Sequence, residues 1–159
     1  MHKMKGLYYL LDSIKALSEV KVCIVGEKSD FIDERVISVG MKRGEDLVKE
    51  MQKASLLALP SIGHMEGFPM VLIEAMACQT PVIGTNRGGI PEVIRDGIDG
   101  FIVPANDSNS LALAISKILA DKELAIRMGQ CGEAKVREQL TWDTRVSLTK
   151  EVFEYTLKG

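Results

Sequence analysis

Apolar and polar residues repeat along this chain with two periods, one typical of helices and one of strands. Apolar residues between positions 6 and 17 recur at the three- and four-residue spacing of a single helical face. Short runs rich in valine and isoleucine end in glycine, as buried parallel strands often do. The complete pattern predicts helices over residues 6–17, 45–54, 69–78, 90–94 and 110–120, a helical tail from residue 121, and a last helix from about residue 142. It predicts strands over residues 21–26, 35–40, 55–60, 81–85 and 100–104.

Strands that alternate with helices predict an α/β fold, a Rossmann-like doubly wound parallel sheet, in one domain over residues 1–159. The helices from about residue 142 belong to that domain. The chain opens with a helix, whereas such folds normally open with a strand at the centre of the sheet. We therefore expect the first strand of the fold to be lacking, and the chain to be part of a larger protein.

Composition narrows the classes of function. The chain has 159 residues, of which 46% are hydrophobic and 26% charged, with a formal net charge of −2. This balance disfavours nucleic acid as a partner, and no apolar run approaches the roughly 18 residues of a membrane span. The first residues lack a signal-peptide cleavage site, so we expect a cytoplasmic protein. Cys23, Cys78 and Cys131 form no CxxC pair, which predicts reduced, buried thiols and no zinc site.

Two carboxylates flank the start of the helix predicted over residues 69–78. This helix is apolar except for Glu74, so we expect it to be buried on every side. A buried carboxylate needs a hydrogen-bonding partner to offset its desolvation. Glu66 lies eight residues earlier, in a loop with Gly67 behind it. The pair predicts a ligand site.

The same loop favours a ligand that carries both phosphate and hydroxyl groups. Open parallel sheets bind ligands at the carboxyl ends of their strands, where loops 40–43, 61–69 and 86–89 are expected. The first amides of the helix that starts at Pro69, those of Met70 and Val71 among them, have no helical acceptor and can hold phosphate. Carboxylates nearby would accept hydrogen bonds from hydroxyls. A nucleotide sugar offers both.

The run PSIGHMEGFPMVLIEAMACQTPVIGTNRGGIPEVIRDGIDGFIVP (residues 60–104) resembles the C-terminal half of retaining, GT-B-type glycosyltransferases with the E-x7-E motif, the group 1 glycosyltransferases. Glu66 and Glu74 stand at the two motif positions. The segments EGF, LIEAMAC, GGIPEVI and DGFIVP occur in the order and spacing of that family. Lys5–Gly6 resembles the opening of its first helix, and Thr141–Trp142 the start of its closing helix, so the resemblance covers the whole chain.

The resemblance implies the donor-binding domain of an enzyme that transfers a hexose from a nucleotide-diphosphate sugar to a polysaccharide or other glycoconjugate. Glu66 would be the catalytic residue and stabilise positive charge at the anomeric carbon. Glu74 would accept the ribose hydroxyls, and Lys5 would neutralise the leaving diphosphate. The donor would also be lined by Gly40 and Met41 at the base, and by Gly67, Phe68, Pro69, Met70 and Val71 at the sugar and diphosphate. The resemblance implies no metal and no cofactor. UDP-sugars are favoured, with GDP- and ADP-sugars left open.

Some features depart from the family. Its arginine upstream of the lysine would fall before Met1, and Gln79 stands where it has glycine. The connection over residues 27–34 is short, so we expect it to lack the family's extra helix. The N-terminal, acceptor-binding domain of the family is absent from this sequence, so we expect weak donor binding and no transfer by the chain alone. Any membrane contact, at the inner face of the membrane, would come through those missing parts.

Several interpretations stay open at this point. The chain could instead be a stand-alone, non-catalytic nucleotide-sugar-binding module. A nicotinamide-binding domain fails, because no G-x-G-x-x-G follows a predicted strand. His64 is expected to face solvent rather than act as a base, and Arg87 offers a second phosphate contact. Trp142 and the methionines are expected to pack in the core or against another domain.

Overall fold

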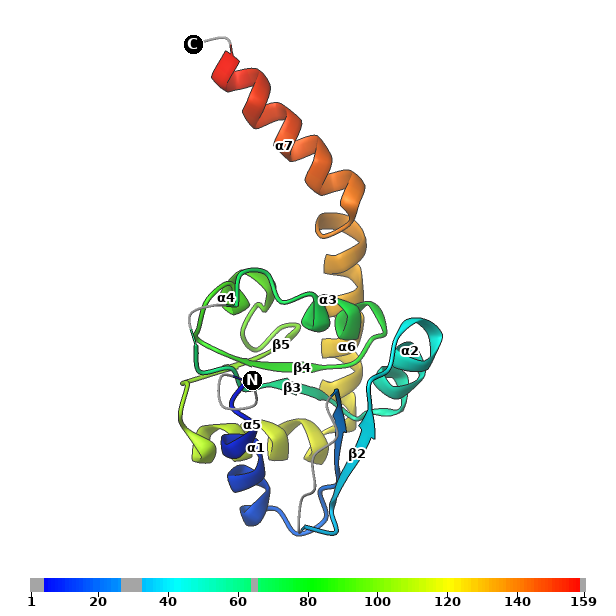
Figure 1. The fold of residues 1–159 in the computed structure, drawn as a ribbon, viewed down its shortest axis with the longest axis vertical. Helices are drawn as coiled ribbons and strands as arrows, with labels where there is room; N and C mark the ends of the chain where they lie inside the picture. The colour runs from blue at the N-terminus through cyan, green and yellow to red at the C-terminus, as the bar shows by residue number, and fades with distance from the viewer. Residues whose placement is uncertain (1–4, 27–32, 64–65, 158–159) are drawn as a thin grey trace.

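The computed structural model describes residues 5–26, 33–63 and 66–157 and has the predicted alternation of strands and helices (Figure 1). Its strands are β1 (Val22–Val25), β2 (Val36–Gly40), β3 (Leu57–Leu59), β4 (Val82–Thr85) and β5 (Gly100–Val103). Its helices are α1 (Leu7–Ser13), the 3-10 turn η1 (Ile14–Ala16), α2 (Gly44–Lys53), α3 (Met70–Ala77), α4 (Ile90–Val93), α5 (Ser108–Ala120), α6 (Lys122–Gln139) and α7 (Trp142–Leu157). Every predicted element is confirmed, with ends that differ by a few residues.

Side-chain caps explain where two helices begin. The carboxylate of Asp107 accepts hydrogen bonds from the amides of Asn109 and Ser110, so α5 starts two residues before its predicted first residue. Asp121 caps α6 in the same way through the amide of Leu124. The second cap follows directly on the end of α5, which makes the turn between the two helices short.

The strands are parallel, as predicted, but they form two sheets instead of one. One sheet has the order β1-β2 and the other has the order β3-β4-β5. All four residues of the central strand β4 are buried. Figure 1 shows why: α3 and α4 lie on one side of this sheet, and α1 and α5 lie on the other. The predicted doubly wound α/β arrangement is therefore confirmed for the three-stranded sheet.

Successive residues of β4 point into two hydrophobic clusters, one on each face of the sheet. Val82 belongs to the cluster beneath α3 and α4, and Ile83 to the cluster beneath α5. The first cluster holds Met51, Leu59, Leu72, Ile73, Ala75, Met76, Ile90, Val93 and Ile94, and the second holds Val103, Leu111, Ala114, Ile115, Ile118 and Met128. These clusters fix the carboxyl ends of β3 and β4, where the candidate site begins.

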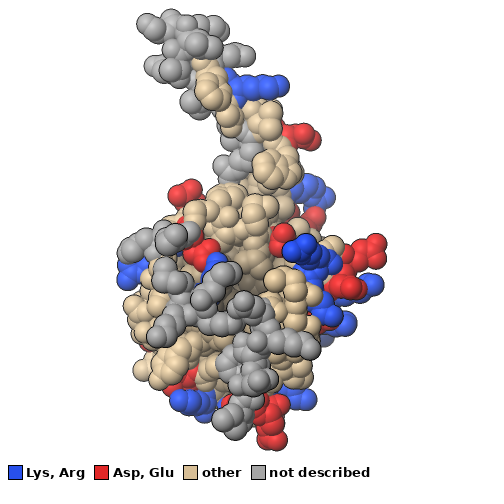
Figure 2. Space-filling view, in the orientation of Figure 1, with Lys and Arg blue, Asp and Glu red and all other residues tan. Residues whose placement is uncertain are grey.

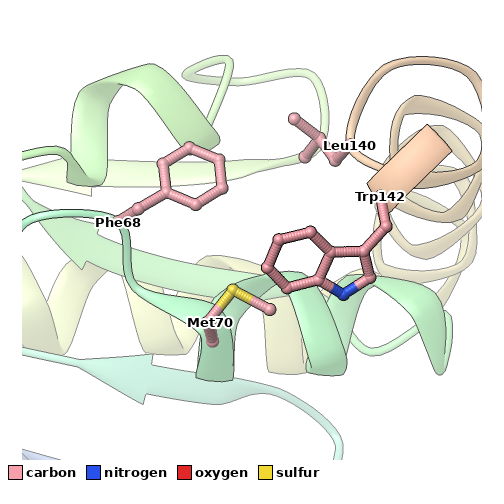
Figure 3. Close-up of a pocket in the computed structure, with 4 residues that line it drawn as sticks. All are labelled: Phe68, Met70, Leu140 and Trp142. Carbon is pink, nitrogen blue, oxygen red and sulfur yellow. The ribbon is translucent and has the colours of Figure 1, made fainter. Parts of the chain in front are cut away.

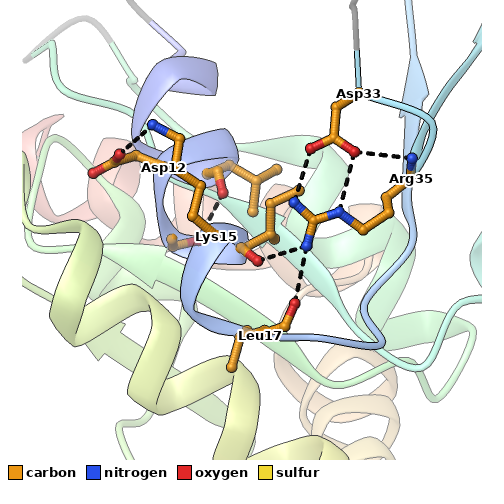
Figure 4. Close-up of polar contacts among 8 residues, drawn as sticks. Asp12, Lys15, Leu17, Asp33 and Arg35 are labelled. Carbon is orange, nitrogen blue, oxygen red and sulfur yellow. Dashed lines mark hydrogen bonds and ion pairs between the residues drawn. The ribbon is translucent and has the colours of Figure 1, made fainter.

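Arg35 connects the two-stranded sheet to the end of the first helical segment (Figure 4). Its guanidinium donates to the backbone carbonyls of Ile14 at 2.9 Å and Leu17 at 3.0 Å, and it pairs with Asp33 at 2.8 Å. The hydrogen bonds from Arg35 hold the pKa of Asp33 below its usual range. One side chain thus ties the start of β2 to η1 and to the turn before the strand.

The expected burial of the cysteines is wrong. Cys23 is exposed on the edge of the two-stranded sheet, and Cys78 and Cys131 are half-buried. All three are free thiols, as expected. For Cys23 the apolar neighbours in sequence misled the prediction, because alternate residues of a strand face opposite sides.

Candidate functional site

Glu66 lies in the loop between β3 and α3, and two donors from different segments bind one of its oxygens. Ser61 donates its hydroxyl to Oε1 of Glu66 at 2.7 Å, and Lys5 forms an ion pair with the same oxygen. The side chain of Glu66 is 15% exposed. Burial alone raises the pKa of Glu66, but the hydrogen bonds from Lys5 and Ser61 and the lysine charge outweigh burial and lower the pKa. Glu66 is therefore held as a carboxylate.

The backbone of Gly6 explains how Lys5 reaches Glu66 across 61 residues of sequence. Gly6 has a φ of 68°, a left-handed conformation that favours glycine. Any other residue at this position would carry a Cβ atom, and that Cβ would lie 1.8 Å from the carbonyl oxygen of Pro60. The two segments therefore touch backbone to backbone. This contact places Lys5 beside the loop that leaves β3.

The glycines after β4 support the same loop from its other side. The amide of Gly89 donates to the carbonyl of Glu66 at 2.7 Å. A Cβ at Gly88 would lie 2.2 Å from that carbonyl oxygen, and a Cβ at Gly89 would lie 1.8 Å from the carbonyl oxygen of Gly67. Arg87 precedes them, and its Nε is buried without a hydrogen-bond partner among the residues described. Gly88 and Gly89 thus support the backbone of Glu66. The phosphate contact predicted for Arg87 stays a prediction.

The expectation that α3 is buried on every side is wrong. Leu72, Ile73, Ala75 and Met76 are buried, whereas Met70, Glu74 and Ala77 are exposed. The exposed residues are spaced i, i+4 and i+7, so they form one stripe along the helix. Glu74 therefore faces solvent and needs no internal partner. Its position one turn into α3, rather than its burial, is what remains in favour of a ligand role.

The start of α3 leaves backbone groups open. The helix begins at Met70, so Pro69 is the residue before the first helical position and not the first position itself, and no side chain caps the helix. Pro69 is buried, and Val71 packs partly against the core, so its amide rather than its side chain remains for a ligand. Gly67 is exposed, and a Cβ there would meet nothing within 4 Å. A ligand can approach this backbone closely.

An apolar pocket of about 200 Å³ adjoins this loop (Figure 3). Phe68 and Met70 line it from the start of α3, and Leu140 and Trp142 line it from the junction of α6 and α7. Trp142 is 78% exposed, so it does not pack in the core, and packing against another domain stays a prediction. In the space-filling view, uncharged surface lies where α7 leaves the body of the molecule (Figure 2). Pockets that bury drug-sized ligands are larger, roughly 300–1,000 Å³.

Other predicted site residues lie apart from Glu66 or outside the described residues. Gly40 ends β2 and Met41, which is 67% exposed, follows it, so both belong to the sheet that does not lead to Glu66. His64 and most of the connection over residues 27–34 lie outside the described residues. Within the described ranges, no three metal-binding side chains gather and no helix is long and apolar enough to cross a membrane.

Ser61 and Thr85 are site residues that the sequence analysis missed. The side chain of Ser61 is fully buried, and Thr85 at the end of β4 is 2% exposed. Thr85 donates its hydroxyl to the backbone carbonyl of Ser61, and Ser61 donates its own hydroxyl to Glu66. Their positions at the carboxyl ends of two neighbouring parallel strands were the available signal, because such positions meet at one edge of a sheet.

Comparison with known proteins identifies the family. A family model described as "Glycosyl transferases group 1" matches residues 1–121. The chain belongs to this family. It is 30% identical over 160 residues to an uncharacterised glycosyltransferase of Methanocaldococcus jannaschii, covering 94% of this chain and 44% of that protein. It is 34% identical over 157 residues to N-acetyl-alpha-D-glucosaminyl L-malate synthase of Bacillus anthracis, covering 91% of this chain and 40% of the synthase.

Solved structures agree with this membership. Sucrose-phosphate synthase from Thermosynechococcus elongatus has a TM-score of 0.85 and 28% identity to this chain. The match covers 98% of this chain and 43% of the synthase. Anabaena HepE, solved in complex with UDP-glucose, matches all of this chain and 47% of its own, with a TM-score of 0.83 and 22% identity, which shows the fold. The matches confirm a GT-B-type, Rossmann-like α/β half. The chain spans less than half the length of these four proteins.

Proposed function

We propose that this chain is the donor-binding domain of a retaining glycosyltransferase. The enzyme transfers a hexose from a nucleotide-diphosphate sugar to a polysaccharide or other glycoconjugate without a metal ion. The observation that carries the proposal is the meeting of Lys5 and Glu66 at the carboxyl end of β3, directly before the open N-terminus of α3. The cation and the first helix amides match the diphosphate of such a donor, and the carboxylate matches its sugar.

Glu66 is the proposed catalytic carboxylate. Loss of the nucleoside diphosphate leaves positive charge on the anomeric carbon, and a fixed carboxylate stabilises that charge most strongly in the transition state. The lowered pKa of Glu66 keeps the carboxylate charged at neutral pH. The amide of Gly89 binds the carbonyl of Glu66, and Gly88 and Gly89 lie closely against this backbone, so the carboxylate is attached to a well-supported segment. A charged group that needs no rearrangement suits this role.

Lys5 and the start of α3 are the proposed diphosphate site. The side chain of Lys5 is 48% exposed, so its ammonium group can turn from Glu66 toward an incoming phosphate. The amides of Met70 and Val71 and the positive end of the helix dipole add neutral donors. The exposed backbone of Gly67 admits the sugar, beside Phe68 and the buried Pro69. Negative charge on the leaving diphosphate would be neutralised where it develops.

Glu74 and the end of β2 are the proposed nucleoside site. The exposed carboxylate of Glu74 can accept hydrogen bonds from the two ribose hydroxyls. Gly40 and Met41 would contact the base through backbone groups, which favours no base strongly. UDP-glucose is the probe of choice, because HepE binds it on the same fold. GDP- and ADP-sugars remain alternatives for the natural donor.

The rest of the enzyme is proposed to come from a second, N-terminal α/β domain that binds the acceptor. Relatives with more than twice this length support that proposal. In such an enzyme the second domain would cover the donor from the other side, so this chain alone should bind the donor weakly and transfer nothing. We place the complete enzyme in the cytoplasm, where nucleotide sugars would reach it.

Calorimetric titration with UDP and with UDP-glucose tests the assignment. Glu74→Ala should abolish binding of both ligands, whereas Glu66→Ala should weaken UDP-glucose binding more than UDP binding. Glu19→Ala, a change at an exposed glutamate in the turn before β1, should leave both affinities unchanged. Equal losses for the two ligands in Glu66→Ala would contradict the proposed contact with the sugar. Robust transfer by the chain alone would contradict the need for a second domain.

A further inference from the structure

Glu66 is held by one half-exposed partner and one buried partner. Lys5 carries its charge on a long side chain that is 48% exposed. Ser61 is fully buried, and its hydroxyl lies 2.7 Å from Oε1 of Glu66. The two partners therefore differ in what a ligand can do to them: an anion can draw the lysine away, but it cannot displace the serine.

The serine is itself held by the neighbouring strand. Thr85, the last residue of β4, donates its hydroxyl to the backbone carbonyl of Ser61 at 2.5 Å. Thr85 is 2% exposed and lies opposite Val103 of β5 in the sheet. Ser61 therefore takes its position from the centre of the three-stranded sheet, the most buried part of the fold.

Both hydrogen bonds to the carboxylate of Glu66 fall on the same oxygen. Lys5 and Ser61 both bind Oε1, and within the described ranges no hydrogen bond reaches Oε2. A carboxylate has lone pairs on both oxygens, so this arrangement anchors one oxygen and leaves the other for a ligand. The anchored oxygen sets the direction in which the second oxygen points.

We infer that Ser61, supported by Thr85, is a positioning residue that keeps the Glu66 carboxylate aimed at the donor sugar while Lys5 turns to the diphosphate. This inference rests on the proposed role of Glu66. Neither hydroxyl touches the reacting atoms; they act through Glu66. A carboxylate that loses its lysine on donor binding would otherwise be free to rotate, and a loosely held catalytic group loses much of its effect.

The test measures sugar preference, defined as the ratio of the dissociation constants for UDP and UDP-glucose. Ser61→Ala should reduce this preference about tenfold, the effect of one hydrogen bond to a charged group, with UDP affinity unchanged. Thr85→Val should reduce it in the same direction, and Thr85→Ser, which keeps the hydroxyl, should restore it. Ser13→Ala is the matched control, since Ser13 is 2% exposed and donates its hydroxyl to the carbonyl of Leu10 far from the site.

A carboxyl NMR titration of Glu66 in the ligand-free chain adds a readout that a loss of stability would not move. Ser61→Ala should raise the pKa of Glu66, because the charged form loses a hydrogen bond, and Ser13→Ala should leave it unchanged. Wild-type sugar preference together with a wild-type Glu66 titration in Ser61→Ala would overturn the inference and leave the proposed function standing. Absence of any preference for UDP-glucose in the unmutated chain would overturn both.

Discussion

Gly6 and Pro60 touch so closely that a Cβ on the glycine would lie 1.8 Å from the proline carbonyl oxygen. The contact joins the residue before α1 to the first residue after β3. Because Lys5 precedes Gly6 and Ser61 follows Pro60, it also brings together the two donors that bind Glu66. The geometry of the candidate site therefore begins with a backbone contact and not with its charges.

Replacement of Gly6 by alanine should destabilise the chain strongly. Its left-handed backbone, with φ of 68°, costs about 1–2 kcal/mol for a residue with a Cβ, and the overlap with Pro60 adds to that. Chemical denaturation should show a loss of about 3 kcal/mol or more. Gly97→Ala is the control: Gly97 has a φ of 74° with open space around it, so it should lose only the backbone part. Equal losses in the two variants would mean that the contact with Pro60 relaxes at little cost.

The ion pair of Glu66 should make stability depend on pH in the acid range. Because the pKa of Glu66 is lowered on folding, its contribution is complete above the ordinary carboxyl value of 4.5 and is lost as the pH falls through the folded value. Since Lys5 is half exposed, we expect a contribution of about 1 kcal/mol. Urea denaturation of wild type and Glu66→Gln should differ by this amount at pH 7 and converge as the pH falls below the lowered pKa of Glu66.

Glu19→Gln serves as the control for that titration, because Glu19 is exposed. Its stability should run parallel to wild type across the range. A wild-type advantage over Glu66→Gln that grows as the pH falls below 4.5 would contradict the sign of the shift.

The end of α3 offers a stabilising substitution. Gln79 has a φ of 59°, and the amides of Gln79 and Thr80 donate to the carbonyls of Met76 and Ala75, the hydrogen bonds of a Schellman motif. Glycine is the usual residue at this position, so Gln79→Gly should raise the free energy of unfolding by about 0.5–1 kcal/mol. Asn106→Gly, at a φ of 65°, should gain less, because asparagine tolerates this conformation. Thermal denaturation of both variants measures these gains, and a loss of stability in Gln79→Gly would contradict the prediction.

Trp142 should contribute little to the stability of this chain. Its side chain is 78% exposed on the rim of the apolar pocket, so Trp142→Ala removes few packing contacts and should cost less than about 0.5 kcal/mol. Leu72, which is fully buried on the inner face of α3, gives the comparison: Leu72→Ala should cost about 2–5 kcal/mol. A cost for Trp142→Ala close to that of Leu72→Ala would place the indole in a packed interface.

The sequence predicts Glu66 and Lys5 as site residues, and the structure brings the two together. Local chemistry explains part of this success: a glutamate followed by Gly67, in a loop that leads into an apolar helix, is a strong signal. Resemblance to a family supplied the rest, since nothing in the residues around Lys5 indicates a partner 61 positions away. The close contact that connects them is made by Gly6 with Pro60. A glycine in the sequence permits such a contact but does not indicate which residue it touches.

The burial of Glu74 was predicted wrongly for a physical reason. Composition states how apolar α3 is, but only packing decides which of its faces is covered, and the stripe through Met70 and Glu74 is left open. Ser61 and Thr85 were missed for a related reason. Small hydroxyl residues at strand ends are common, and their function depends on a neighbour contributed by another strand.

The hydrogen bonds of Arg35 have a consequence for local unfolding of this molecule. A pair of strands is barely stable in water without further support, and the Arg35 guanidinium supplies some of it to β1 and β2 by binding the carbonyl of Ile14 in η1 and that of Leu17 just after it. Amide protons of this ribbon should exchange through partial unfolding, well before those of β4. The proposed nucleoside end of the donor would thus bind beside the two-stranded sheet, which unfolds locally more easily, and the sugar end would bind beside the more stable three-stranded sheet.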